Sequence, residues 1–140
     1  MEDFVTFEIA NKLKEKGFRE ECLVYYTTEY TLYNNVITLT NDKYLCVSDI
    51  DYEEFLMSHN SIKYTNGNYI DAPTISQALK WLMERKKIHI CISYSDNINT
   101  MWEYEVILLD GALYQNAGDG YMSYEEAALA GIEYCLDNLI

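Results

Sequence analysis

The stretch that decides the fold, residues 71–94, reads D-A-P-T-I-S-Q-A-L-K-W-L-M-E-R-K-K-I-H-I-C-I-S-Y. Its first part has the signals of a helix start. Pro73 disfavours helical geometry in the residue before it. Thr74 and Gln77 have the three-residue spacing of a capping box. These signals predict a helix over 74–86.

The apolar residues in this stretch change their period at its midpoint. At first they recur at helical spacing, which predicts one buried stripe made of Ile75, Ala78, Leu79, Leu82 and Met83. From residue 88 the period is two, which predicts a strand over 88–94. Its core face would hold Ile88, Ile90, Ile92 and Tyr94, with His89, Cys91 and Ser93 on the other face. Helix and strand are therefore expected to share one core.

The chain beyond residue 94 continues with strands and a final helix. The sequence predicts a strand over 101–109, a two-residue turn at Asp110-Gly111, and a strand over 112–115 that sets Leu108 opposite Leu113. One face of this pair would hold Trp102, Tyr104, Val106, Leu108 and Leu113, and the other Glu103, Glu105, Ile107, Leu109 and Tyr114. Ser123 and Glu126 have capping-box spacing at the start of a helix over 123–139. Its predicted stripe is Ala128, Ile132, Cys135, Leu136 and Leu139, and the small residues Ala127, Ala130 and Gly131 would allow close approach to the sheet.

The chain before residue 71 is less regular. Thr6 can cap a helix over 6–16 that ends at Gly17. Strands are expected over 22–26, 36–40 and 43–47, the last two paired across a two-residue connection. Residues 48–70 read as loop-rich, with a short helix reaching Met57 and a turn at Asn66-Gly67. The prediction is one α+β domain over 1–140, an antiparallel sheet of the 88–115 meander and the N-terminal strands, covered by the three helices.

Charge is unevenly distributed along the 140 residues, whose formal net charge is -13. The segment 88–140 contains no Lys or Arg. Its acidic residues are Asp96, Glu103, Glu105, Asp110, Asp119, Glu125, Glu126, Glu133 and Asp137. Because binding a nucleic-acid backbone requires cations, this balance argues against direct contact with nucleic acid.

The sequence also indicates where the protein is located and in what state its cysteines are. No apolar run approaches the roughly 20 residues of a membrane span, and the N-terminus M-E-D-F does not look like a signal peptide, so a cytoplasmic protein is expected. The cysteines at 22, 46, 91 and 135 form no C-x-x-C pair. They are expected to be reduced, buried thiols, with no cofactor or metal bound.

Three segments resemble a family of small proteins encoded by Bacteroides-type gut bacteria and by their phages and mobile elements. These are F-E-I-A-N-K-L-K-E-K-G-F (7–18), D-A-P-T-I-S-Q-A-L-K-W-L (71–82) and Y-E-E-A-A-L-A-G-I-E-Y-C-L-D-N-L-I (124–140). The resemblance implies an accessory protein of a mobile element. The family has no established activity, so the resemblance assigns no functional residue.

Several residue groups could carry chemistry or binding. His89 and Cys91 share a strand face and could form a metal site or a Cys–His pair, but no further ligand cluster is visible. Glu103 and Glu105 also share a face, and paired carboxylates can carry out acid–base chemistry if their pKa values are pushed apart. The residues A-G-D-G at 117–120 are interpreted as a turn into the last helix. Asp49, Asp51 and Tyr52 belong to an acidic cluster that could dock a basic partner.

These observations favour a small non-enzymatic binding protein that acts through a protein partner, with contacts at Glu103, Glu105, Asp49, Asp51 and Tyr52. An acidic decoy that imitates nucleic acid and blocks a DNA-binding enzyme is the alternative. A small enzyme using His89 and Cys91 is the least favoured interpretation. No membrane contact is expected, and the oligomeric state, including a homodimer, stays open.

Overall fold

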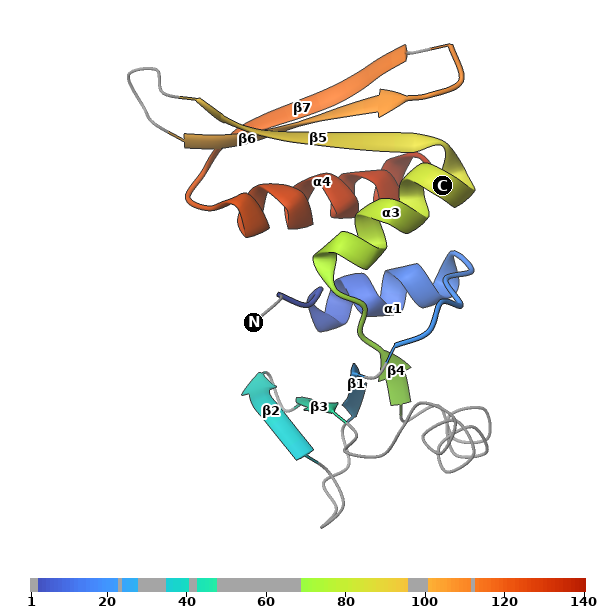
Figure 1. Ribbon diagram of the computed structural model, residues 1–140, viewed down its shortest axis with the longest axis vertical. Helices are drawn as coiled ribbons and strands as arrows, with labels where there is room; N and C mark the ends of the chain where they lie inside the picture. Colours follow the sequence, from blue (N-terminus) through green and yellow to red (C-terminus); the bar gives the residue numbers. More distant parts are fainter. Residues whose placement is uncertain are drawn as a thin grey trace. The chain divides into compact units, whose positions relative to one another are not determined.

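The computed structural model describes residues 3–22, 24–27, 35–40, 43–47, 69–95, 101–111 and 113–140. Helices and antiparallel strands confirm the predicted α+β class (Figure 1). The chain divides into two compact units, one spanning Thr6–Pro73 and the other combining Met1–Val5 with Thr74–Ile140. The single domain over 1–140 stays a prediction.

The unit Thr6–Pro73 opens with helix α1, Phe7–Glu15. Thr6 caps it by accepting a hydrogen bond from the Ile9 N–H at 3.3 Å. At the other end the Phe18 N–H donates to the Leu13 carbonyl at 2.9 Å, and Gly17 has a φ of 99°. This is a Schellman ending, as the sequence predicts, because only glycine adopts that φ without strain.

The sheet of this unit contains β1 (Val24–Thr27), β2 (Asn35–Thr40), β3 (Lys43–Val47) and β4 (Tyr69–Asp71), in the order β2-β3-β1-β4. The pair Thr40↔Lys43 confirms the predicted antiparallel pairing of β2 with β3. Strand β1 begins two residues after the predicted start at Cys22. The predicted helix up to Met57 and the turn at Asn66-Gly67 lie outside the described residues.

The unit that combines Met1–Val5 with Thr74–Ile140 contains helix α3, Ile75–Lys86. Both bonds of the predicted capping box are present: Gln77 N–H to Thr74 Oγ1 at 3.1 Å and Thr74 N–H to Gln77 Oε1 at 2.9 Å. The predicted buried stripe is partly wrong. The buried residues are Ile75, Ala78, Trp81 and Leu82, whereas Leu79 is half-buried and Met83 is 39% exposed. The large Trp81 ring buries more area than either of those side chains, so the helix presents that flank to the core.

Strands β5 (Ile88–Ser95), β6 (Met101–Leu108) and β7 (Leu113–Tyr121) form an antiparallel sheet in the order β5-β6-β7. The pair Leu108↔Leu113 confirms the predicted hairpin register. Two predictions are corrected here. This sheet is separate from the sheet of the N-terminal strands, and β7 continues to Tyr121 instead of ending at residue 115.

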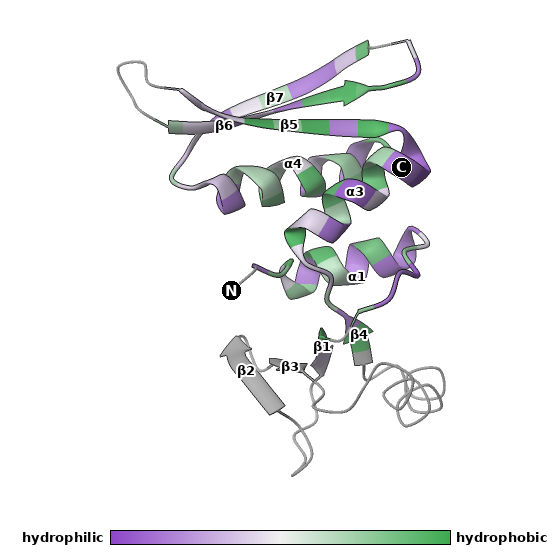
Figure 2. Ribbon diagram, viewed as in Figure 1, coloured by the Kyte–Doolittle hydropathy of each residue, from purple (hydrophilic) through white to green (hydrophobic). Residues whose placement is uncertain are grey.

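Helix α4, Tyr124–Asn138, packs with α3 on one side of this sheet (Figure 1). Its buried residues are Ala127, Ala128, Gly131, Ile132, Cys135 and Leu136, so the predicted stripe holds except at Leu139, which is half-buried. The Ser123 hydroxyl accepts the Glu126 N–H at 3.1 Å, while Glu126 Oε2 accepts from the Met122 N–H instead of completing a capping box. Figure 2 shows apolar colour along much of β5 and α4, which agrees with a core between sheet and helices.

Candidate functional site: the open face of the β5–β6–β7 sheet

One face of the β5–β6–β7 sheet points away from α3 and α4, and we call it the open face. On β5, Ile88 and Ile90 are buried toward the helices, so the alternate residues lie on the open face. The register extends this assignment across the sheet, because directly opposite residues share a face. The open face consists of His89, Cys91, Ser93, Glu103, Glu105, Ile107, Tyr114 and Ala117.

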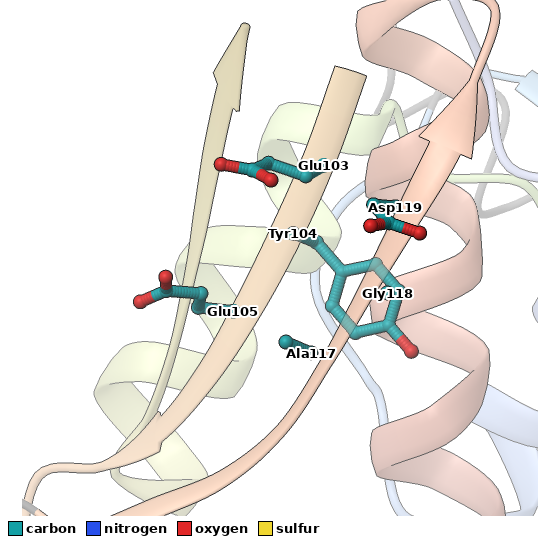
Figure 3. A pocket seen from close by; sticks show the side chains of 6 residues that line it. All are labelled: Glu103, Tyr104, Glu105, Ala117, Gly118 and Asp119. Carbon is teal, nitrogen blue, oxygen red and sulfur yellow. The ribbon is translucent and has the colours of Figure 1, made fainter. Parts of the chain in front are cut away.

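Two carboxylates occupy the centre of the open face, on β6. Figure 3 shows Glu103 and Glu105 leaving the strand on the side opposite Tyr104. The Ser93 hydroxyl, on β5, donates to Glu103 Oε1 at 3.1 Å, which holds this carboxylate in place. Glu105 is exposed and lies opposite Cys91. The predicted pairing of these two acids on one face is therefore observed.

The opposite face of the same strand is anchored by Tyr104, which is buried. Its hydroxyl accepts a hydrogen bond from Asn116 Nδ2 at 3.2 Å, and burial raises the pKa of Tyr104. Gly118 lies against the Tyr104 ring, since a Cβ at Gly118 would meet the ring Cε1 at 2.5 Å. Glycine at 118 therefore lets β7 cross closely over the ring.

A shallow pocket of about 180 Å³ lies where β6 and β7 run side by side (Figure 3). Its lining consists of Glu103, Tyr104, Glu105, Ala117, Gly118 and Asp119. Sites for drug-sized ligands usually enclose about 300–1,000 Å³. The pocket is smaller than that range, and its lining includes the carboxylates of Glu103, Glu105 and Asp119.

The segment 117–120 corrects a prediction from the sequence. The residues A-G-D-G are part of β7 and not a turn into α4. Trp102 pairs with Tyr121 but Tyr104 pairs with Gly118, so a bulge at Asp119 and Gly120 faces Glu103. Gly120 has a φ of 85°, which accounts for a glycine in the bulge. This bulge adds Asp119 to the pocket lining. The sequence did not predict this, because the glycines at 118 and 120 suggested a loop instead of a strand.

His89 and Cys91 are on the open face, as predicted. Among the described residues, no group of three or more His, Cys, Asp or Glu side chains is placed to hold a metal ion. The prediction of buried cysteines holds for Cys22 and Cys135 and is wrong for Cys91, which is a free, exposed thiol. Cys91 is exposed because odd-numbered positions of β5 face away from the helices.

The remaining predicted contact residues, Asp49, Asp51 and Tyr52, lie outside the described part of the chain. Within that part, no helix has both the length and the apolar character to cross a bilayer. The sequence matches no protein-family model, and no curated protein or solved structure matches it.

Proposed function

We propose that this protein is a non-enzymatic binding protein that takes a basic protein partner on the open face of its β5–β6–β7 sheet. The observation that carries the proposal is the pair Glu103 and Glu105, which project together from β6 within a segment, 88–140, that has no Lys or Arg. The resemblance to proteins of phages and mobile elements favours a cytoplasmic accessory protein of such an element.

The composition of the open face supports surface recognition. The acidic groups of a segment that has no Lys or Arg create a negative field, which steers a basic partner and speeds its association. Tyr114, which is 61% exposed, and the half-buried Ile107 add an apolar contact beside the acids. An interface of this kind uses charge for orientation and an aromatic side chain for contact energy.

A charge-reversal experiment with a matched control tests the proposal. The partner is captured from the host lysate, and its association rate is measured with wild type and with the Glu103→Lys, Glu105→Lys variant. The control, Glu133→Lys with Asp137→Lys, makes the same change in net charge on exposed positions of α4. We expect the open-face variant to slow association at low salt far more than the control does. Equal effects of the two variants, or rates that do not depend on salt, would reject the open face.

The acidic decoy is the second candidate, favoured by the absence of cations from 88–140. In that case the captured partner is a DNA-binding protein, and duplex DNA competes with this chain for it. The competition is strongly salt-dependent, because both ligands neutralise the same cations. Capture that DNA does not weaken would leave the basic-partner proposal and exclude the decoy.

A further inference from the structure

The outer edge of β5 pairs with no other strand that the structure describes, and it has unusual regularity. The strand order β5-β6-β7 places it at the side of the sheet, and among the described strands only β6 pairs with it. Its sequence I-H-I-C-I-S-Y-S has no Lys, Pro, Gly or acidic residue, and its register with β6 is uninterrupted. The other edge strand, β7, is broken by two register shifts. Natural sheets blunt edges with bulges and charges, so β7 is protected whereas β5 is left ready to pair.

One hydrogen bond fixes which backbone groups of β5 point outward. The Leu109 N–H donates to the Lys87 carbonyl at 2.8 Å, which makes Lys87 and Leu109 a hydrogen-bonded pair. Such pairs alternate along an antiparallel ladder, so the odd-numbered residues of β5 turn their backbone groups toward β6. The N–H and C=O groups at the outer edge therefore belong to Ile88, Ile90, Ile92 and Tyr94.

We propose that this edge binds β5 of a second copy of the chain, antiparallel, with the two-fold axis at Cys91. In this register Ile88 lies opposite Tyr94 of the second copy, and Ile90 opposite its Ile92. Every outward N–H and C=O of those four residues then has a partner on the other strand. A register centred on Ile90 or Ile92 would leave some of these groups beyond the end of the partner strand. The contact is isologous, as closed dimers require, and it joins the two sheets into one.

Side chains agree with the same register. The opposite pairs on the helix side are apolar, and on the open face His89 lies opposite Ser93 of the second copy. Antiparallel pairing also brings Lys87, the cation directly before β5, toward the far end of the other β5, where Glu103 is bonded to Ser93. Opposite charges thus approach at both ends, and no like charges meet along the strand.

Cys91 provides a direct probe of this register. It would face Cys91 of the second copy at a non-hydrogen-bonded position, where Cα atoms are about 4.5 Å apart, within the range that a disulfide spans. Oxidation of wild type with diamide should therefore give a covalent dimer on a non-reducing gel, and Cys91→Ser should abolish it. In the Cys91→Ser background, His89→Cys and Ser93→Cys together should restore the cross-link, because these positions face each other. Neither His89→Cys nor Ser93→Cys alone should restore the cross-link, because the same cysteine in the two copies of the chain would be about 13 Å apart along the strands.

Sedimentation tests the non-covalent dimer under reducing conditions. Wild type should have a dimer mass, whereas Cys91→Asp and Cys91→Lys should each sediment as monomers, because they place like charges across the axis. An equal mixture of the two variants should recover the dimer. Circular dichroism of each variant should match wild type, since residue 91 is exposed. A wild-type monomer at all concentrations, or a dimer that neither variant weakens, would overturn the proposal. These measurements read self-association alone, so their outcome is separate from that of the basic-partner test.

Discussion

Tyr104 shows at the level of one residue how the sheet and α4 fit together. Its ring lies against two glycines, because a Cβ at Gly118 would meet the ring at 2.5 Å and one at Gly131 would meet it at 3.2 Å. Gly131 also approaches Ile90, whose Cγ2 would lie 2.9 Å from an added Cβ. The sequence indicated Gly131 as a close-approach position, but it gave no sign of Gly118, because that role depends on the register of β7.

Cys135 leads to a prediction about alkaline pH. Burial raises the pKa of its thiol to about 12, whereas an unfolded cysteine has a pKa of about 8.5. As the pH rises, the unfolded chain therefore loses this proton before the folded chain does. The contribution of the protonated Cys135 thiol to stability is complete below about pH 8.5 and is lost as pH rises toward 12. We expect the unfolding free energy to fall across this window by up to about 1.4 kcal/mol per pH unit from this group.

Urea denaturation from pH 7 to 11 measures this slope. Cys135→Ala should show a shallower slope than wild type, although its stability at pH 7 is lower because of the cavity. Ile132→Val removes a methyl group from another buried position of α4 without changing a titrating group, so it should keep the wild-type slope. Identical slopes for wild type and Cys135→Ala would show that this thiol does not govern the alkaline transition.

At the scale of elements, helix α3 separates what local sequence determines from what packing determines. Its start and its capping box follow from Thr74 and Gln77 and were predictable. The identity of its buried face was not, because Leu79, Met83 and Trp81 lie on different flanks and only the position of the sheet selects among them. Strand β7 shows the same limit, since its bulges place glycines inside a strand, where local sequence predicts a turn.

The rotated face of α3 has a measurable consequence for stability. Leu82→Ala should lower the unfolding free energy by about 2–5 kcal/mol, because Leu82 is fully buried. Leu79→Ala should cost clearly less, since Leu79 is half-buried, and Thr74→Ala should cost about 1 kcal/mol through the lost cap. Chemical denaturation of the three variants gives the order. A loss at Leu79 as large as that at Leu82 would support the stripe expected from periodicity, which contains both residues.

At the scale of the whole molecule, part of the candidate site was predictable from the sequence. Alternation along the strand after residue 101 put Glu103 and Glu105 on one face, and the structure agrees. The sequence could not show that Ser93 bonds to Glu103 or that Asp119 lines the same pocket, because both follow from the registers of β5 with β6 and of the bulged β7 with β6. Nor could it assign the N-terminal strands to a second sheet, because strand patterns specify faces but not partners.

The chain passes twice between the two compact units, and the described residues at these points are largely buried. The chain crosses between them at Val5–Thr6 and at Pro73–Thr74. Within one of the units, the segment Met1–Val5 is joined to the start of α3, since Phe4 bridges Thr74 and the Ile75 N–H donates to the Asp3 carbonyl at 3.0 Å. Linkers between independent domains are exposed and polar, whereas Val5, Pro73 and Thr74 are all buried. We therefore expect the two units to unfold in one transition.

The placement of the tryptophans makes this expectation testable. Trp81 and Trp102 are the only tryptophans of the chain, and both belong to the unit that contains Thr74–Ile140. Leu13 is fully buried in the other unit, so Leu13→Ala should cost about 2–5 kcal/mol there. If unfolding is cooperative, this change must lower the denaturation midpoint read by tryptophan fluorescence as much as that read by circular dichroism. Leu82→Ala, in the tryptophan-bearing unit, should lower both in the same way. A fluorescence midpoint that Leu13→Ala leaves at the wild-type value would instead mean that each unit unfolds on its own.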